Sequence, residues 1–140
     1  MSSALAVGID VGTSGARAVA MTKELTVVAQ ASASMKDFGD DWRSPAGWWK
    51  AVECALDRML ASIDPRQVKA LAVDGTSGTV LPVDRDGMPL AGALMYNDPV
   101  DDPVVLDAIR KYAPAESAAH GATSGLAKFI RFQSAPKPCR

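Results

Sequence analysis

Short apolar runs separated by polar turns open the chain. Residues 4–9, 16–21 and 25–31 are mostly apolar, and each run is bounded by glycine, threonine, serine or charged residues. Runs of this length with such boundaries are typical of buried strands rather than helices. The segment Thr22-Lys23-Glu24 between the last two runs predicts a tight turn. The chain is therefore predicted to begin with three strands in succession.

A helical spacing of apolar residues follows this opening. Ser44 and Pro45 predict a helix start, because serine caps helices and proline is tolerated at the first helical position. The helix is predicted to end at Asp64-Pro65, since a residue before proline avoids the helical conformation. Its apolar residues recur at three- and four-residue spacing and form one face: Trp48, Val52, Leu56, Met59, Leu60 and Ile63.

The second half of the chain alternates extended and helical patterns. Three apolar runs predict further extended segments: residues 68–73, 79–83 and 90–95. Two more helices are predicted to begin at Asp102-Pro103 and at Thr123-Ser124, with Leu126, Phe129 and Ile130 on the apolar side of the last one. Strands that alternate with helices after an opening meander predict an α/β layered fold.

Composition and charge exclude several classes of protein. The chain has 140 residues, of which 48% are hydrophobic and 22% are charged, as expected for one domain with a sizeable core. The net charge of −1 favours neither nucleic acid nor an anionic membrane. No apolar run approaches the ~20 residues that cross a bilayer, and the start lacks the basic region of a signal peptide. Cys54 and Cys139 form no disulfide framework, so reduced thiols in a cytoplasmic protein are expected.

The turn after the first strand carries the clearest candidate chemistry. Gly12-Thr13-Ser14-Gly15 offers N–H and hydroxyl donors that converge, as phosphate binding requires. Asp10 would hold a metal ion or its water ligands, since a carboxylate repels phosphate. Arg17 either supplies positive charge there or lies on the solvent face of the second strand. The alternative is a β-hairpin that needs glycine and serine only for its shape.

Two later motifs could belong to the same ligand site. Gly75-Thr76-Ser77-Gly78 repeats the sequence of the first turn, and each turn follows an apolar run and an aspartate. A duplication and the same turn chemistry used twice are both open. Tyr96-Asn97-Asp98 places an aromatic ring beside an amide and a carboxylate, which suits sugar binding but is also a common turn sequence. Polar turns at strand ends are typical of ligand sites in α/β folds.

Three motifs together resemble the FGGY carbohydrate kinases in order and spacing: Gly8-Ile9-Asp10-Val11-Gly12-Thr13-Ser14, Asp74-Gly75-Thr76-Ser77-Gly78-Thr79 and Tyr96-Asn97-Asp98. Residues 72–81 are most similar to the ribulose and xylulose kinases of cyanobacteria and plants. The resemblance implies an α/β, ribonuclease-H-like (actin-like ATPase) domain, with a mixed sheet, an opening antiparallel meander and flanking helices, here incomplete. Two such domains would close on ATP, Mg²⁺ and a sugar.

The resemblance also assigns roles to single residues. Asp10 would lie near the transferred phosphate and hold the metal through water. Phosphate would be bound by Gly12, Thr13, Ser14 and Arg17. The sugar, a ketopentose such as ribulose or xylulose or a related polyol, would be contacted by Thr76, Ser77, Tyr96, Asn97 and Asp98. The family often carries arginine where this chain has Val100, which puts one sugar-side contact in doubt.

Length limits what the resemblance implies, because family members are roughly three times as long as this chain. The expected organisation is a partial amino-terminal kinase domain over residues 1–132 and a frayed tail over 133–140. The second domain, the catalytic base and the adenosine pocket would be absent, so the chain is expected to be inactive alone. A missing carboxyl-terminal half or a homodimer is the expected partner. A non-catalytic sugar-binding or regulatory remnant and an actin-like nucleotide-binding domain without a sugar role are the alternatives.

Overall fold

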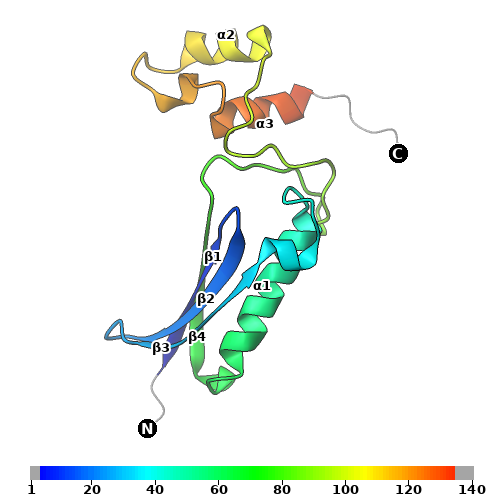
Figure 1. Ribbon diagram of the computed structural model, residues 1–140. Helices are drawn as coiled ribbons and strands as arrows, with labels where there is room; N and C mark the ends of the chain where they lie inside the picture. The colour runs from blue at the N-terminus through cyan, green and yellow to red at the C-terminus, as the bar shows by residue number, and fades with distance from the viewer. Residues whose placement is uncertain (1–3, 135–140) are drawn as a thin grey trace. The chain divides into compact units, whose positions relative to one another are not determined.

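The computed structural model describes residues 4–134 and divides into two compact units, Met1–Thr76 and Ser77–Arg140 (Figure 1). The first unit contains a four-stranded sheet and one long helix. The second contains two shorter helices and an irregular extended segment. Within residues 4–134 no helix is long and apolar enough to cross a membrane.

The sheet of the first unit is mixed and has the strand order β3-β2-β1-β4. Its strands are β1 (Leu5–Val11), β2 (Gly15–Thr22), β3 (Val27–Ser34) and β4 (Val68–Gly75). The first three form an antiparallel meander, and β4 pairs with β1 in parallel. A parallel neighbour needs a long crossover, which α1 (Pro45–Leu60) supplies between β3 and β4. The predicted opening meander is therefore confirmed. The first helix begins where predicted but ends at Leu60, before the predicted end at Asp64-Pro65.

The turn between β2 and β3 is longer than the sequence predicts. Leu25 has a φ of 63°, and its N–H donates to the carbonyl of Thr22 over 3.0 Å. The N–H of Thr22 in turn donates to the carbonyl of Thr26 over 2.9 Å. These bonds curl the chain before it becomes extended, so β3 begins at Val27 and not at Leu25.

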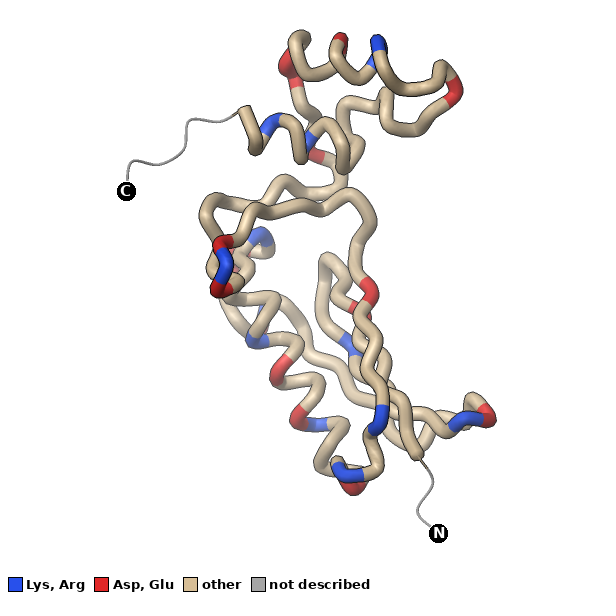
Figure 2. Tube along the Cα trace, turned by 180° about the vertical axis from the view of Figure 1, so that it is seen from behind, with Lys and Arg blue, Asp and Glu red and all other residues tan. Residues whose placement is uncertain are grey.

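One face of the sheet is buried under α1, and small side chains form most of the contact. The alternation along β1 and β2 turns every second residue toward the helix: Leu5, Val7, Ile9, Ala16, Ala18 and Ala20. On α1 the buried positions are Gly47, Ala51, Ala55 and Met59. The larger apolar residues of the predicted face, Met59 apart, pack half-buried against this core. Charged residues occupy the solvent side of the helix (Figure 2).

The second unit is built around two antiparallel bridges and two helices. Residues 80 and 94 pair, as do Val83 and Pro89, but only as isolated bridges, so the two predicted extended segments do not form regular strands. The helices are α2 (Pro103–Tyr112) and α3 (Gly125–Ser134), which begin where the sequence predicts. The core of this unit consists of Val100, Val105, Ile109 and Ala127.

Short 3-10 helices occur in both units. The first unit contains η1 (Met35–Phe38) and η2 (Pro65–Gln67), and the second contains η3 (Ala118–His120).

Two predictions for the last helix need correction. Its buried residues are Ala127 and Lys128, whereas Leu126 and Phe129 are 43% and 54% exposed. The predicted apolar side is therefore wrong except for Ile130, which packs against the core. The helix also runs to Ser134, so the first two residues of the predicted tail are helical. Residues 135–140, with Cys139, lie outside the described part of the chain, and Cys54 is a free thiol.

Candidate functional site at the strand ends

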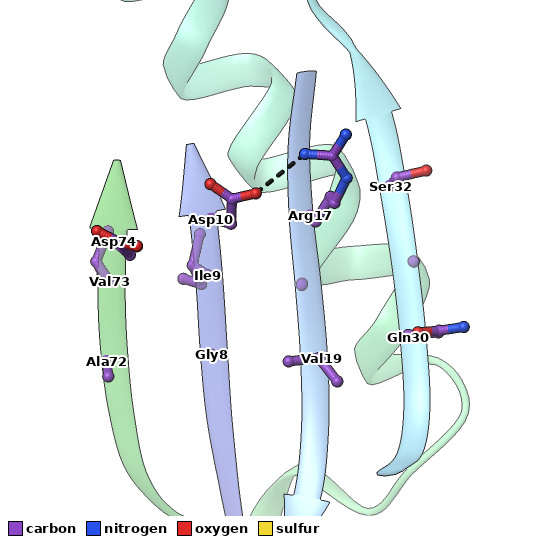
Figure 3. A pocket seen from close by; sticks show the side chains of 12 residues that line it. Gly8, Ile9, Asp10, Arg17, Val19, Gln30, Ser32, Ala72, Val73 and Asp74 are labelled. Atoms are coloured by element: carbon purple, nitrogen blue, oxygen red, sulfur yellow. Dashed lines mark hydrogen bonds and ion pairs between the residues drawn. The ribbon is translucent and has the colours of Figure 1, made fainter. Parts of the chain in front are cut away.

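The carboxyl ends of β1 and β4 bring two aspartates together. The strands are parallel, and Asp10 is paired in register with Asp74. Figure 3 shows both carboxylates on neighbouring strands, near the strand ends and on the face of the sheet that α1 leaves open. The chain turns directly after each strand, at residues 12–14 and 76–78. In open α/β sheets, this edge beyond the carboxyl ends of parallel strands is where ligands bind.

An open groove of about 780 Å³ lies along this face of the sheet. Its middle is lined by small or apolar residues such as Gly8, Val19 and Ala72. Its polar lining includes Asp10 and Arg17 near the strand ends (Figure 3). The groove therefore joins an apolar floor to a charged end beside the two turns.

Arg17 pairs with Asp10 across the first two strands. The two residues are opposite each other in the antiparallel register, and Nη1 of Arg17 lies 3.0 Å from Oδ2 of Asp10. Their side chains are 61% and 51% exposed. Nη1 of Arg17 also lies 3.6 Å from the point where a Cβ on Gly12 would be. The sequence leaves two placements of Arg17 open, beside the turn or on the solvent face of β2. The structure combines them, because Arg17 lies on the exposed face of the sheet and its guanidinium is within reach of the turn.

The first turn is a tight β-hairpin loop. The N–H of Gly12 donates to the carbonyl of Gly15 over 3.0 Å, and Thr13 and Ser14 are exposed at its tip. A Cβ on Gly15 would lie 2.5 Å from the carbonyl oxygen of Ala33, so this glycine is required by close packing of β2 on β3. The hairpin shape and a phosphate-binding role are compatible, because the tip residues remain open to solvent.

The second turn repeats the sequence of the first but not its geometry. Oδ1 of Asp74 accepts a hydrogen bond of 2.8 Å from the N–H of Gly75, and the N–H of Thr76 donates to the carbonyl of Val11 over 3.3 Å. Gly78 has a φ of 79°, whereas Gly15 begins a strand. The sequence leaves open a duplication or the same turn chemistry used twice. The geometry favours the second explanation, because the same residue types form two different turns.

In the second unit, the Tyr96-Asn97-Asp98 element forms a closed turn. Oδ2 of Asp98 accepts from the N–H of Met95 over 2.8 Å, and the N–H of Asp98 donates back to the carbonyl of Met95 over 2.9 Å. The N–H of Tyr96 donates to Oγ1 of Thr79 over 3.1 Å. Tyr96 and Asn97 are exposed. Asp98 therefore shapes the turn, while the ring and the amide are presented to solvent.

Lys128 is a buried charged residue that sequence reasoning missed. Its ammonium donates hydrogen bonds of 2.7 Å to the carbonyl of Gly78 and 2.6 Å to the carbonyl of Met95. Burial lowers the pKa of Lys128, and the negative charge of Asp98 partly opposes that shift. One feature of the sequence could have indicated its burial. Lys128 lies in α3 between Ala127 and Ile130, both of which pack into the core. Asp74 was predicted only as part of the second motif and was given no role of its own, although it precedes the second turn as Asp10 precedes the first.

The predicted site residues fall into two groups. Asp10, Arg17, Thr76 and the turn at residues 12–14 belong to the first unit, at the end of its sheet. Ser77 and residues 96–98 belong to the second unit. Within residues 4–134 no group of three or more His, Cys, Asp or Glu side chains forms a metal cluster. Asp10 and Asp74 are the two carboxylates that the register of β1 and β4 brings side by side at the strand ends.

Comparison with known proteins decides the family. Residues 5–118 match the FGGY family of carbohydrate kinases, N-terminal domain. The chain belongs to this family. The members are phosphotransferases that act on carbohydrates, and the family assignment confirms the resemblance seen in the three sequence motifs.

Relatives with curated names cover more than one substrate. The chain is 29% identical over 96 residues to a xylulose kinase from Klebsiella pneumoniae, covering 66% of this chain and 20% of the relative. It is 28% identical over 100 residues to a glycerol kinase from Thermococcus gammatolerans, covering 63% and 19%. The chain thus spans about a fifth of the length of these curated relatives.

Solved structures confirm the predicted fold class. The xylulose kinase from Bifidobacterium adolescentis superposes with a TM-score of 0.61 at 23% identity, covering 94% of this chain and 26% of that one. The chain therefore has the α/β, actin-like ATPase fold of FGGY kinases, with a mixed four-stranded sheet and flanking helices that form an incomplete version of it.

Proposed function

We propose that this chain contributes the first phosphate turn and part of the sugar pocket to ATP-dependent phosphorylation of a sugar hydroxyl. The observation that carries the proposal is the pairing of Asp10 with Asp74 at the ends of parallel strands, beside the exposed turn at residues 12–14. Phosphoryl transfer depends mainly on positioning and on neutralising charge. An anion-binding turn, an arginine and two carboxylates are suited to those tasks.

ATP and Mg²⁺ are the cofactors that this end of the sheet fits. Mg²⁺ keeps several water ligands and binds one or two carboxylates together with phosphates, so the neighbouring carboxylates of Asp10 and Asp74 suit it. Asp10 holds the ion through water, with Asp74 beside it. Gly12, Thr13 and Ser14 form the phosphate-binding turn, with Thr13 and Ser14 exposed at its tip and the N–H of Gly12 bonded to the carbonyl of Gly15. When bound, the ion neutralises phosphate charge, and Arg17 adds a second positive charge near the same turn.

The sugar is bound by Thr76, Ser77, Tyr96, Asn97 and Asp98. The exposed ring of Tyr96 stacks on C–H groups, and the amide of Asn97 binds hydroxyls. Asp98 acts indirectly, because its carboxylate accepts from the N–H of Met95. The substrate class is a ketopentose such as ribulose or xylulose, or a related polyol. Relatives named for xylulose and for glycerol support this range.

The 140-residue chain alone does not turn over substrate in this proposal. Its charged groups lie on an open groove, where water screens them, and phosphoryl transfer needs a closed site. A carboxyl-terminal kinase half, or a second copy in a homodimer, completes the site. We place the chain in the cytoplasm, where ATP is available. Residues 1–132 act as one partial kinase domain.

Assays of turnover and binding test this proposal. We expect no ADP release from ATP with ribulose, xylulose or glycerol, while calorimetry detects weak sugar binding. Clear turnover by the isolated chain would show that its site is complete. Sugar binding without any nucleotide binding would support the alternative, a non-catalytic sugar-binding or regulatory remnant. Nucleotide binding with no sugar binding would instead favour an actin-like domain without a sugar role.

A further inference from the structure

Lys128 is the one charged side chain classed as buried within residues 4–134, with no solvent exposure. It lies in the second unit, in the first part of α3, next to the core residue Ala127. Removing an ammonium group from water is unfavourable unless hydrogen bonds replace its hydration. A buried lysine at this position therefore needs hydrogen-bond acceptors from the protein in place of water.

The partners of Lys128 come from two segments that are distant in sequence. Its Nζ atom is 2.7 Å from the carbonyl oxygen of Gly78 and 2.6 Å from that of Met95. Hydrogen bonds from a charged donor are stronger than those between neutral groups. The two segments are also close to each other, since a Cβ on Gly78 would lie 3.9 Å from the Cα of Tyr96. One ammonium thus joins both backbones.

The two carbonyls flank the residues proposed to bind sugar. Gly78 directly follows Ser77, and Met95 directly precedes Tyr96. The carbonyl of Met95 also accepts the N–H of Asp98, which closes the turn. The bond between Tyr96 and Thr79 links the same two segments independently of the lysine. Lys128 therefore adds charged hydrogen bonds at the point where residues 77–79 meet residues 95–98.

We propose that Lys128 is a positioning residue of the sugar pocket. It holds residues 77–79 against the turn at residues 95–98, so that Ser77, Tyr96 and Asn97 face the sugar in one fixed arrangement. Lys128 does not touch the sugar, because its side chain is buried. This inference rests on the proposed sugar-binding role of these residues. The hydrogen bonds of Lys128 would preorganise the pocket, and a pocket that is already ordered loses less entropy on binding.

The substitution Lys128→Met separates this role from simple space filling. Methionine keeps an unbranched apolar side chain of similar length and removes both the charge and the donors. The matched control is Lys111→Met, which removes an exposed lysine from α2 in the same unit. If Lys128 only fills the core, the two variants will behave alike at residues 77–79 and 95–98.

Amide hydrogen exchange measures the order of the turn without any ligand. In Lys128→Met we expect at least about tenfold faster exchange at Tyr96 and Asp98, because charged hydrogen bonds that fix the turn are lost. The amides of Leu106 and Ala113, which are bonded at the two ends of α2, should change less than about threefold. Unchanged exchange at Tyr96 and Asp98, or an equal rise throughout the unit, would overturn the inference.

Sugar binding then tests the functional part. Calorimetry with ribulose, xylulose and glycerol should show affinity at least about tenfold weaker for Lys128→Met, and unchanged within about twofold for Lys111→Met. Equal affinity of wild type and Lys128→Met would overturn the positioning role and leave the proposed function standing. Absence of sugar binding by the wild type would instead refute the sugar role, and with it this inference.

A second variant keeps the test decisive if Lys128→Met does not fold. Lys128→Cys, made with Cys54→Ser and Cys139→Ser, can be alkylated while unfolded to carry either an aminoethyl or a neutral propyl group. The aminoethyl form restores an ammonium at nearly the reach of lysine. We expect it, and not the propyl form, to recover slow exchange at Tyr96 and Asp98 and sugar affinity. Equal recovery by both forms, or recovery by neither, would overturn the inference.

Discussion

At the scale of single residues, the pair of Arg17 and Asp10 links the sheet to its proposed chemistry. The two side chains meet at 3.0 Å, but both are more than half exposed. Exposed ion pairs contribute little to stability, since water screens the charges and two long side chains lose freedom. The pair is therefore better explained by the position it gives to two charges beside the first turn. Arg17 can contact a phosphate there once the negative charge of the ligand competes with Asp10.

The substitution Arg17→Gln should separate binding from stability. We expect the free energy of unfolding to change by less than about 1 kcal/mol, because the ion pair is solvent-exposed. We expect affinity for Mg²⁺-ATP to fall by roughly tenfold, since one charged contact to phosphate is removed. Urea unfolding and nucleotide titration measure the two quantities. Arg66→Gln, in the same unit but paired with Asp64, is the control, and an equal loss of affinity in both variants would argue against a local role for Arg17.

At the scale of elements, α1 determines which face of the sheet is open for ligands. It covers the face that carries Val7 and Ile9 and leaves the opposite face, with Asp10 and Arg17, to the groove. Alanines at positions 51 and 55 let the helix approach the sheet closely. Met59 is the largest fully buried side chain of the first unit, and it belongs to the same buried face of α1 as these alanines.

Met59→Ala should destabilise the first unit by about 2–5 kcal/mol, because it removes a buried side chain and leaves a cavity. Lys50→Ala, at an exposed position of the same helix, should change stability by less than about 0.5 kcal/mol. Tryptophan fluorescence during urea unfolding is a suitable measurement, since all three tryptophans lie at positions 42, 48 and 49. Similar midpoints for the two variants would mean that α1 does not pack on the sheet as described.

The turn that leads into β4 provides a pH-dependent contribution. Asp64 caps η2, and hydrogen bonds from the Arg66 side chain and N–H hold the pKa of that carboxyl below its ordinary value of 3.8. A carboxyl with a lowered folded-state pKa stabilises the fold above its unfolded pKa. This stability is lost as the pH falls through the lower, folded-state pKa. The contribution is small, because the pair is open to solvent.

Urea unfolding at pH 5 and at pH 3 checks this sign. The wild type should lose slightly more stability than Asp64→Asn over this interval, since only the wild type has the Asp64 carboxylate to protonate. Added salt should reduce the difference. A larger acid-induced loss in Asp64→Asn than in the wild type would contradict the assigned direction.

The local elements could be predicted from sequence, whereas the packing between distant residues could not. Ser44 and Asp102 mark helix starts by side-chain chemistry that acts over three residues, and both caps form. The burial of Ala51 and Ala55 depends on the sheet beneath them. The three- and four-residue spacing of apolar residues therefore predicted the larger side chains of α1 as its buried face instead of these alanines. Lys128 is buried because two carbonyls 33 and 50 positions away accept its ammonium. The pairing of Asp74 with Asp10 likewise needs the parallel register of β4 and β1.

At the scale of the whole molecule, the two units carry different parts of the proposed chemistry. The first presents a phosphate turn with its aspartates and arginine, and the second presents the Tyr96-Asn97 surface with Lys128 behind it. Membership in the FGGY family explains why both occur in one chain. Because the chain spans about a fifth of its curated relatives, the complete reaction is proposed for a larger assembly.

The central claim is that the end of β1 binds the phosphates of Mg²⁺-ATP. The most direct measurement is an NMR titration of the chain with Mg²⁺-ATP at millimolar concentration. Shifts should concentrate at the amides of Gly12, Thr13 and Ser14 and should disappear in Asp10→Asn, while Asp57→Asn on the exposed side of α1 responds like the wild type. Absence of shifts at these three amides, or identical shifts in Asp10→Asn, would contradict the claim.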